Sequence, residues 1–330
     1  MSKVMVLSRA AVLRHLSIAD CIPIIDRALR DISAGGAIQP VRTRISPPGV
    51  AGALGLMPGY IRESRALGIK VVTVFEDNFG RGLPSHRGAV LLFDAADGAL
   101  KGIFDAGAVT AVRTAAASAV ATRALAAAGA ERLSILGYGE QATAHVEAML
   151  LVRSIRQVRV WGRSSAKATE FAARMATRHA IDARAESTVN AAVAEAQIIC
   201  TTTAAREPIL CGDAVAAGCH VNLVGSSFPD AREADSLLVA RSRFFVDDRK
   251  MVEALGGEFR AALTDGSVDA AHLLGEIGEV LNGTVAGRRY ASDLTVFKSV
   301  GVIAEDLAAA THLYAAARDA ARDDVAWIDL

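Results

Sequence analysis

A ten-residue segment near the middle of the chain constrains the fold more than any other. Residues Leu133–Leu136 form an apolar run typical of a buried strand, and Gly137 to Ala142 follow it in the pattern Gly-x-Gly-x-x-Ala. In this pattern the first glycine permits a tight turn, the second lets the backbone approach a phosphate, and the alanine allows close packing of a helix on the strand. The segment therefore predicts a strand, a turn and a helix whose N-terminus faces an anion.

The surrounding sequence supplies the context that this motif requires. Strand-like runs at 158–161, 196–201 and 221–224 alternate with helix-like segments that begin near residues 141 and 165. Alternation of this kind builds a parallel sheet covered by helices, and the motif is informative only between a strand and a helix. We therefore predict an α/β fold with a dinucleotide-binding Rossmann domain over residues 119–293.

The end of the second strand of this domain selects the dinucleotide. A chain that binds NAD usually carries an acidic residue there, which binds the ribose 2′-hydroxyl. This chain instead reads Trp161-Gly162-Arg163-Ser164-Ser165, and Arg163 can form a two-pronged contact with a 2′-phosphate to which both serine hydroxyls add. The predicted cofactor is NADP(H), with NAD(H) left open as a second one. The alternative is a solvated Arg163 next to a Ser165 that caps the following helix.

The first third of the chain has a different pattern. An amphipathic helix is predicted over residues 20–32 with Asp20 as its N-cap, and short strand-like runs follow between residues 41 and 93 without long helices between them. This pattern predicts an α+β domain over residues 1–118 with a mainly antiparallel sheet. An alanine-rich helix at 111–128 would lead into the Rossmann domain, and residues 294–330 could return to the first domain.

Composition excludes several classes of protein. The 330 residues are 52% hydrophobic and 22% charged with a net charge of +0, which indicates globular domains and disfavours nucleic-acid or anionic-membrane partners. Arginines interrupt the apolar tracts, so no membrane span is predicted, and the N-terminus lacks the pattern of an export signal, which favours the cytoplasm. The four cysteines lack paired spacing and are expected to be reduced, and no metal site is predicted.

Three cations stand in otherwise apolar surroundings. Lys70 interrupts a strand-like run, Arg42 follows Pro40-Val41, and Arg113 is placed at the start of the alanine-rich helix. Charges are unfavourable inside apolar segments unless they have partners, so such residues indicate a site. If the three converged, they could bind a carboxylate. Ordinary surface or ion-pair roles are the alternative for each residue.

At this point the sequence as a whole resembles the ornithine cyclodeaminase/μ-crystallin family, and most closely its ketimine reductase branch. The resemblance covers nearly the whole chain and rests on blocks in the family's order: Gln39–Thr43, Pro84–His86, Arg113–Ala116, the Gly137 loop, Glu207–Leu210, Val224–Glu233, Gly275–Val280 and Thr295–Ser299. It implies a homodimer built through the N-terminal domain and an active site between domains. It also implies that Arg42, Lys70 and Arg113 hold a substrate carboxylate, that His86 lies near the substrate, and that Ser299-Val300-Gly301 lies near the nicotinamide ring. The alternative for His86 is a loop histidine that bonds to a nearby carbonyl.

One departure from the family pattern favours the reductase branch. Cyclodeaminases and their alanine dehydrogenase relatives carry an aspartate two residues after the glycine that matches Gly225, whereas this chain has Ser227. A carboxylate there can accept a proton from a substrate amine, and a serine cannot do so at neutral pH. Reduction of a C=N bond needs a protonated imine instead, which suits a serine or a water that it positions. Asp230, three residues after Ser227, is a candidate to replace the missing aspartate. The alternative is that Asp230 caps a helix or is a surface charge.

The predicted activity is NADPH-dependent reduction of a small cyclic ketimine carboxylate, such as Δ1-pyrroline-2-carboxylate or Δ1-piperideine-2-carboxylate, to proline or pipecolate. The alternatives are an ornithine cyclodeaminase or 3-hydroxyproline dehydratase-type lyase, and a non-enzymatic NADPH-binding protein. The predicted partners are a small imine or amino acid and a second copy of the chain. Predicted catalytic residues are Lys70, Ser227 and His86. The residues predicted to bind the nucleotide are Gly137, Gly139, Glu140, Gln141, Ala142, Arg163, Ser164, Ser165, Thr202, Ser299 and Gly301.

Overall fold

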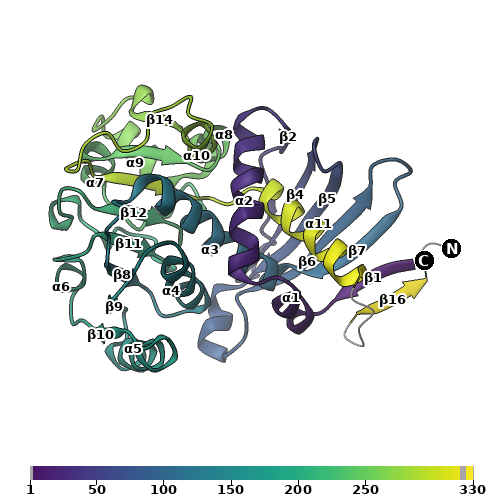
Figure 1. Ribbon diagram of the computed structural model, residues 1–330, viewed down its shortest axis with the longest axis horizontal. Coiled ribbons are helices and arrows are strands. Elements are labelled where there is room, and N and C mark those ends of the chain that lie inside the picture. Colours follow the sequence, from purple (N-terminus) through teal and green to yellow (C-terminus); the bar gives the residue numbers. More distant parts are fainter. Residues whose placement is uncertain (1–2, 320–324, 330) are drawn as a thin grey trace. The chain divides into compact units, whose positions relative to one another are not determined.

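The computed structural model describes residues 3–319 and 325–329. Contacts within the chain divide it into two compact units: unit 1 comprises Met1–Arg113 with Val302–Leu330, and unit 2 comprises Thr114–Gly301. The boundaries expected from the sequence, at 118/119 and 293/294, lie a few residues away from these. Each unit has its own sheet (Figure 1). Residues 1–2, 320–324 and 330 of the predicted domains lie outside the described part of the chain.

The sheet of unit 1 is mainly antiparallel, as predicted. Only β1 and β7 pair in parallel among its described strands. The short strand β3 (Thr43–Ile45) pairs with β4 and stands outside the continuous order of the other seven described strands. In spatial order across the sheet, these strands are β16 (Ala326–Asp329), β1 (Lys3–Leu7), β7 (Leu100–Asp105), β6 (His86–Asp94), β5 (Ala66–Val74), β4 (Ala53–Ile61) and β2 (Ala37–Ile38).

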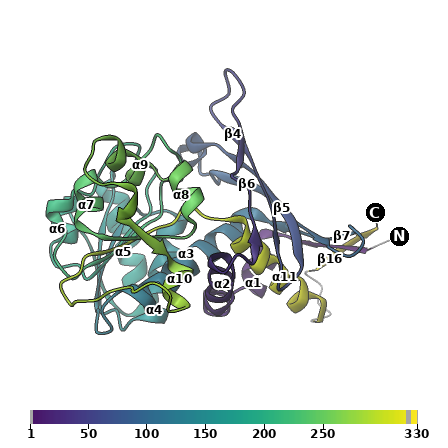
Figure 2. The ribbon, with the colours of Figure 1, turned by 90° about the horizontal axis from the view of Figure 1, so that it is seen from above.

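Helices cover one side of this sheet, as Figure 2 shows for α1, α2 and α11. Their bounds are α1 (Arg9–His15), α2 (Ile18–Ser33) and α11 (Ile303–Asp319), and a 3-10 turn, η1, spans Glu76–Arg81. The predicted helix cap was wrong: Ser17, not Asp20, caps α2, because the Ser17 hydroxyl accepts a hydrogen bond from the Asp20 amide at 3.1 Å. Asp20 therefore lies in the first turn, where its negative charge interacts favourably with the helix dipole.

Two glycines bring α11 close to the sheet. Gly59 and Gly68 are paired across β4 and β5. A Cβ atom would lie 2.5 Å from Ile303 Cγ2 at position 59 and 2.5 Å from Leu307 Cδ2 at position 68, so any larger residue would push the helix away. The close approach buries the first turn of α11 against the sheet.

Unit 2 has the predicted parallel sheet, in which every pair of neighbouring strands runs in parallel. Figure 1 shows β9, β8, β11 and β12 in succession. The strands in spatial order are β10 (Asp182–Ala185), β9 (Gln157–Trp161), β8 (Arg132–Leu136), β11 (Ile198–Thr201), β12 (His220–Leu223), β15 (Thr295–Lys298), β13 (Arg243–Val246) and β14 (Leu273–Glu276). The chain runs outward from β8 to β10 and then returns to β11 on the other side of β8, which creates a topological switch point beside β8.

Helices and short turns connect these strands. They are α4 (Glu140–Val152), α5 (Ser165–His179), α6 (Val189–Val193), η2 (Gly212–Ala214), α7 (Ser236–Arg241), α8 (Arg249–Leu255), α9 (Gly257–Thr264), η3 (Ala270–His272) and α10 (Ile277–Leu281). Together with the parallel sheet they form a Rossmann architecture, which confirms the predicted fold class. Within the described residues, no helix is both long enough and apolar enough to cross a membrane.

The alanine-rich helix α3 (Ala106–Leu125) crosses the boundary between the two units in sequence. It begins five residues before the predicted position 111, because the Asp105 carboxylate accepts a hydrogen bond from the Ala108 amide at 2.7 Å and caps the first turn. Arg113 therefore lies inside the helix and not at its start, which corrects the sequence interpretation.

Candidate functional site

The nucleotide-binding residues predicted in unit 2 lie at one edge of its sheet. The carboxyl ends of parallel strands meet at the same edge, and ligands of such sheets bind there, next to the switch point. In spatial order, Arg163 follows β9, Gly137 follows β8, Thr202 follows β11, Ser227 lies beyond β12 and Ser299 follows β15. The other predicted nucleotide residues belong to these same loops or to the first turns of α4 and α5.

The turn after β8 has the geometry of a phosphate loop. Gly137 has a φ of +129°, and a Cβ atom there would lie 2.6 Å from Thr202 Oγ1, so this position requires glycine. Gly139 is the N-cap of α4, and a Cβ atom at this position would meet nothing within 4 Å, which leaves the backbone accessible. Ala142 is fully buried against the sheet. Residues 137–142 therefore fit a pyrophosphate at the N-terminus of α4.

Thr202 supports this turn from the neighbouring strand. Its amide and its hydroxyl both donate hydrogen bonds to the Leu136 carbonyl, at 2.8 and 3.1 Å. The Gly137 amide donates to the Trp161 carbonyl at 2.8 Å on the other side. These contacts fix the turn between β9 and β11. In this structure Thr202 contacts the phosphate turn, whereas the sequence suggested only that it contacts the nucleotide.

The segment that should choose between NADP and NAD lies at the N-terminus of α5. Ser164 caps this helix, because its hydroxyl accepts a hydrogen bond from the Lys167 amide at 3.4 Å, so the alternative that gave this role to Ser165 is wrong. Arg163 and Ser165 are exposed. Within the described part of the chain Arg163 forms no ion pair, so its guanidinium is available to an anionic ligand at this edge.

A buried carboxylate that the sequence analysis did not identify shapes the turn after β15. Asp247 Oδ2 accepts hydrogen bonds from Ser299 Oγ at 3.1 Å, the Val300 amide at 2.8 Å and the Gly301 amide at 2.7 Å. Gly301 adopts a φ of +75°, which favours glycine. Burial raises the pKa of Asp247, and the hydrogen bonds from this turn oppose that change. The Asp247 carboxylate thus fixes the conformation of the Ser299–Gly301 turn, which is the segment expected near the nicotinamide.

A second buried carboxylate joins the loops after β11 and β12. Glu233 accepts hydrogen bonds from the Thr203 amide and from the Gly225 amide, both at 2.7 Å, and from the hydroxyls of Thr201 and Thr203. Burial raises the pKa of Glu233, and these donors oppose the change. One carboxylate therefore fixes the loop that carries Ser227 relative to its neighbour.

An ion pair continues this network. Lys298 Nζ lies 2.8 Å from Glu258 Oε2 and donates a hydrogen bond to the Ser226 carbonyl at 2.7 Å, and Glu258 Oε1 accepts from the Glu233 amide at 3.0 Å. Both members of the ion pair are fully buried. The sequence carried a signal for Lys298, since it is a charge at the end of an apolar strand, as Lys70 is a charge within one.

We expect Lys298→Met to lower the free energy of unfolding by about 3–5 kcal/mol, because Glu258 would keep a buried charge without its partner. Thermal and urea unfolding of the variant would measure this loss. The double variant Lys298→Met with Glu258→Gln should recover part of it, because both charges are then removed. The matched control is Lys250→Met at an exposed lysine. Equal stability of Lys298→Met and this control would contradict the prediction.

Ser227 and Asp230 lie in the loop beyond β12. Ser227 is half-buried, next to the buried Ser226. Asp230 is exposed and forms an ion pair with Arg206. The structure thus gives Asp230 a surface partner, which does not favour the role of a substitute acid.

Two of the predicted substrate-binding cations meet buried carboxylates in unit 1. Lys70, on β5, is 3% exposed, and its Nζ lies 2.9 and 2.8 Å from the two carboxylate oxygens of Asp306. Arg113 Nη1 lies 2.7 Å from Glu305 Oε2, and its Nε lies 3.2 Å from Asp306 Oδ1. Lys70 also donates to Thr110 Oγ1 at 3.3 Å. Segments β5, α3 and α11 are joined here by charge pairs.

Arg42 and His86 belong to the same cluster. Arg42 is half-buried between β2 and β3, and its charge lowers the pKa values of both Lys70 and His86. Desolvation first, and then the charges of Lys70, Arg113 and Arg42, lower the pKa of His86, although its side chain stays accessible to solvent. The Ser85 hydroxyl lies 3.0 Å from His86 Nδ1. A neutral imidazole thus stands beside three cations.

Sequence reasoning missed Glu305 and Asp306, although both are charges within the otherwise apolar start of α11. Burial lowers the pKa of Lys70 to about 8, with the Asp306 carboxylate as the opposing charge. In return, the charges of Arg113 and Lys70 outweigh the effect of burial on Asp306 and hold the pKa of this carboxyl below its usual value. The cluster can therefore carry buried charges of both signs at neutral pH.

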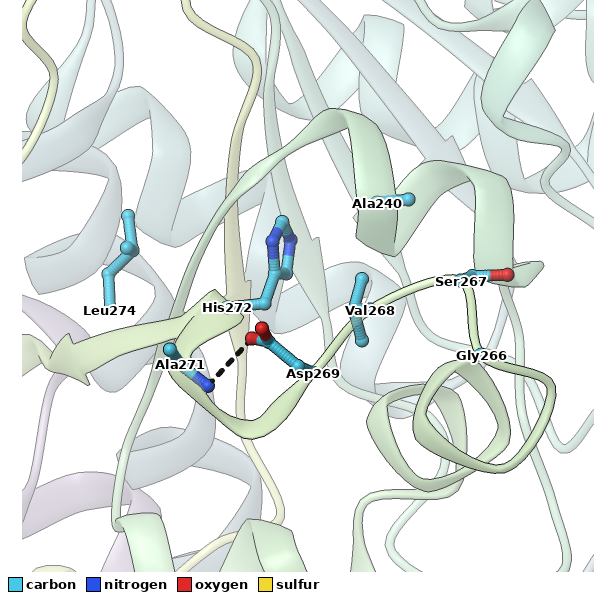
Figure 3. A pocket seen from close by; sticks show the side chains of 8 residues that line it. All are labelled: Ala240, Gly266, Ser267, Val268, Asp269, Ala271, His272 and Leu274. Carbon is cyan, nitrogen blue, oxygen red and sulfur yellow. Dashed lines mark hydrogen bonds between the residues drawn. The ribbon is translucent and has the colours of Figure 1, made fainter.

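A shallow hollow of about 590 Å³ lies elsewhere in unit 2, around residues 266–274 (Figure 3). Two of its polar side chains have local partners: His272 Nε2 lies 2.7 Å from the Val239 carbonyl, and Asp269 accepts from the Ala271 amide at 3.0 Å. None of the predicted site residues lines it. Among the described residues, no group of three or more His, Cys, Asp or Glu side chains is arranged to hold a metal ion.

Comparisons with known proteins cover nearly the whole chain. The model of the ornithine cyclodeaminase/mu-crystallin family matches residues 2–321. Ketimine reductase mu-crystallin of Rattus norvegicus is 40% identical over 296 residues, which is 89% of this chain and 90% of that protein. The structure of Thermococcus litoralis Δ1-pyrroline-2-carboxylate reductase with NADH and L-proline has a TM-score of 0.94 at 32% identity, and the match covers 99% of this chain and 100% of that one. An archaeal alanine dehydrogenase dimer with bound NAD matches with a TM-score of 0.93 at 25% identity over 100% of both chains.

The Rossmann sheet with its phosphate turn, taken with these relatives, defines an NAD(P)H-dependent oxidoreductase. The extent of the family match and the identity to the rat protein make the assignment more specific. The chain belongs to the ornithine cyclodeaminase/mu-crystallin family, which confirms the resemblance found in its sequence.

Proposed function

We propose that the protein uses NADPH to reduce a small cyclic ketimine carboxylate, such as Δ1-pyrroline-2-carboxylate or Δ1-piperideine-2-carboxylate, to L-proline or L-pipecolate. The observation that carries this proposal is the cluster of Lys70, Arg113 and Arg42 in unit 1, which suits a carboxylate ligand. Support comes from the reductase of Thermococcus litoralis, whose structure holds NADH and L-proline.

The predicted substrate-binding and catalytic residues divide the reaction between them in this proposal. Arg42, Lys70 and Arg113 bind the substrate carboxylate, and Lys70 also helps to polarise the imine. His86 and Ser227 manage the water and the proton: solvent water supplies the proton, and the neutral imidazole passes it on by accepting a proton at one ring nitrogen as it donates the proton of the other to the imine nitrogen. NADPH held at the phosphate turn would supply a hydride to the imine carbon. The C=N bond becomes a C–N single bond, and the product is a secondary amine.

The preference for NADPH over NADH rests on the end of β9. Arg163, Ser164 and Ser165 replace the acidic residue that would bind a ribose 2′-hydroxyl, and Arg163 is exposed at the carboxyl edge of the sheet. An arginine can bind a 2′-phosphate through two parallel hydrogen bonds. We therefore assign NADPH as the preferred cofactor, with NADH as a weaker alternative.

We further propose a homodimer built through the unit 1 sheet. The side of this sheet opposite Lys70 carries apolar side chains that are only half-buried, among them Leu56, Ile69, Val71, Leu91 and Ile103. A second copy would cover them, and the archaeal alanine dehydrogenase of the same fold is a dimer. Light scattering should give twice the chain mass of 34.4 kDa. A monomer at micromolar concentration would overturn this part of the proposal.

A cytoplasmic location is also part of the proposal. The cysteines Cys21, Cys200 and Cys219 are buried and free, and Cys211 is exposed and free. Free thiols are typical of reducing compartments. Cell fractionation with an antibody to the chain would test this location.

The reaction itself is tested by following NADPH oxidation with five- and six-membered cyclic ketimine acids, and with open-chain 2-oxo acids plus amines. We expect turnover with the cyclic acids and formation of the saturated amino acid. Release of ammonia from ornithine without net consumption of nucleotide would instead show a cyclodeaminase. Product formation from 3-hydroxyproline without net nucleotide consumption would show a dehydratase.

A further inference from the structure

We propose that Asp306 is a positioning residue, which holds the Lys70 ammonium group in place and protonated for the substrate. This inference deepens the proposed function and rests on it for the identity of the substrate. It assigns a role in the chemistry to a carboxylate on α11, outside the segments that carry the predicted site residues.

The Asp306 carboxylate contacts two of the predicted substrate-binding cations. Its carboxylate lies within 2.9 Å of Lys70 Nζ through both oxygens, and it accepts a hydrogen bond from Arg113 Nε at 3.2 Å. One side chain on α11 thus contacts a cation from β5 and a cation from α3. Gly59 and Gly68 let α11 pack closely on the sheet, and this close packing brings the Asp306 carboxylate to Lys70.

Burial makes the contact essential for the charge of Lys70. Lys70 is 3% exposed and Asp306 is fully buried, so water cannot stabilise the ammonium group. The groups that face Lys70 are Asp306 from α11, Arg113 and Thr110 from α3, Arg42 before β3, and His86 from β6.

Asp306 is the counter-charge in this set. Arg113 and Arg42 are positive, Thr110 is neutral, and His86 is neutral because its pKa is lowered. Burial and the two arginines lower the pKa of Lys70 to about 8, and the Asp306 carboxylate acts in the opposite direction. Glu305 serves as an internal comparison, because it pairs with Arg113.

The protonation of Lys70 determines how kcat/KM should depend on pH. Substrate binding needs the protonated lysine, so kcat/KM should fall as the pH rises through the pKa of Lys70. Asp306→Asn keeps the size of the side chain and removes its charge. Loss of an opposite charge at this distance moves a pKa by about 1–3 units, so the falling limb of the profile should move to lower pH by about that amount.

The experiment measures kcat/KM against pH for the wild type, Asp306→Asn and Glu305→Gln, with Δ1-piperideine-2-carboxylate and saturating NADPH. Ionisation of the substrate affects all three proteins equally, so differences between profiles report the enzyme. We expect the limb to move for Asp306→Asn and to stay near the wild-type position for Glu305→Gln. Coincident limbs for Asp306→Asn and the wild type would overturn the inference.

A second measurement keeps the inference independent of turnover. The ¹³Cε signal of Lys70, assigned with a Lys70→Arg variant, reports protonation directly by NMR, and its midpoint should fall in Asp306→Asn. Circular dichroism and thermal unfolding show whether Asp306→Asn is folded, because Asp306 lies in unit 1, and if this variant fails to fold, Asp306→Glu should keep the midpoint. An unmoved NMR midpoint in Asp306→Asn, or a lowered one in Asp306→Glu, overturns the inference. A wild type without ketimine turnover overturns the proposed function alone.

Discussion

Lys70→Ala is expected to lower kcat/KM for cyclic ketimine reduction by about 10²–10⁴-fold, the range typical of a lost group in proton transfer. The ammonium group is proposed both to bind the carboxylate and to polarise the imine, and its removal would leave the Asp306 carboxylate in contact with Arg113 but without Lys70. NADPH binding should persist, because the predicted nucleotide residues all belong to unit 2. Steady-state kinetics and a fluorescence titration with NADPH measure the two effects.

Lys101→Ala is the matched control for this variant. Lys101 is a partly exposed lysine on β7 of the same sheet, paired with Asp94 at 3.4 Å. Its removal should leave kcat/KM close to the wild-type value. Lys70→Met keeps most of the side-chain volume and separates loss of charge from loss of packing. Undiminished turnover by both Lys70 variants would show that the site has been assigned to the wrong residues.

Arg163→Ala is expected to raise the Kd for NADPH by roughly 10–150-fold, with little change for NADH. A hydrogen bond to a charged group contributes about 1.5–3 kcal/mol, and only NADPH carries the 2′-phosphate that would receive it. Isothermal titration with both nucleotides gives the ratio directly. The preference for NADPH should then largely disappear.

The control for this variant removes an arginine at the opposite end of α5. Arg178 is exposed and pairs with Glu147 at 2.9 Å, so Arg178→Ala changes the net charge equally without touching the end of β9. It should bind both nucleotides as the wild type does. If Arg163→Ala weakened the binding of NADH and NADPH equally, Arg163 would not bind the 2′-phosphate.

Local patterns in the sequence were sufficient to predict most of the fold. The alternation of strands and helices around the Gly137 turn predicted the parallel sheet, because each strand and helix of a Rossmann unit has its own hydrophobic period. The Gly and Pro breaks between residues 41 and 93 likewise predicted the antiparallel sheet. Errors fell at the ends of helices, where a single cap decides the boundary, as at Ser17, Asp105 and Ser164.

The missed residues depend on contacts over long sequence separations. Lys70 and Asp306 are 236 residues apart, and Asp247 lies more than fifty residues before the turn that it holds. No local spacing can pair such groups, so the sequence shows a buried charge without its partner. Glu305 and Asp306 also stand in the first turn of a helix, where acidic residues are common for their interaction with the helix dipole. Their role in the cation cluster became visible only from the packing of α11 on the sheet.

Transfer of deuterium from NADPH that carries deuterium at both C4 positions tests the central claim most directly. The account predicts that Δ1-piperideine-2-carboxylate yields L-pipecolate with one deuterium at the ring carbon that bears the carboxylate, and with one NADPH consumed for each product molecule. Mass spectrometry of the product and absorbance of the nucleotide measure both quantities. Unlabelled product, or product formed without net oxidation of NADPH, would contradict the account.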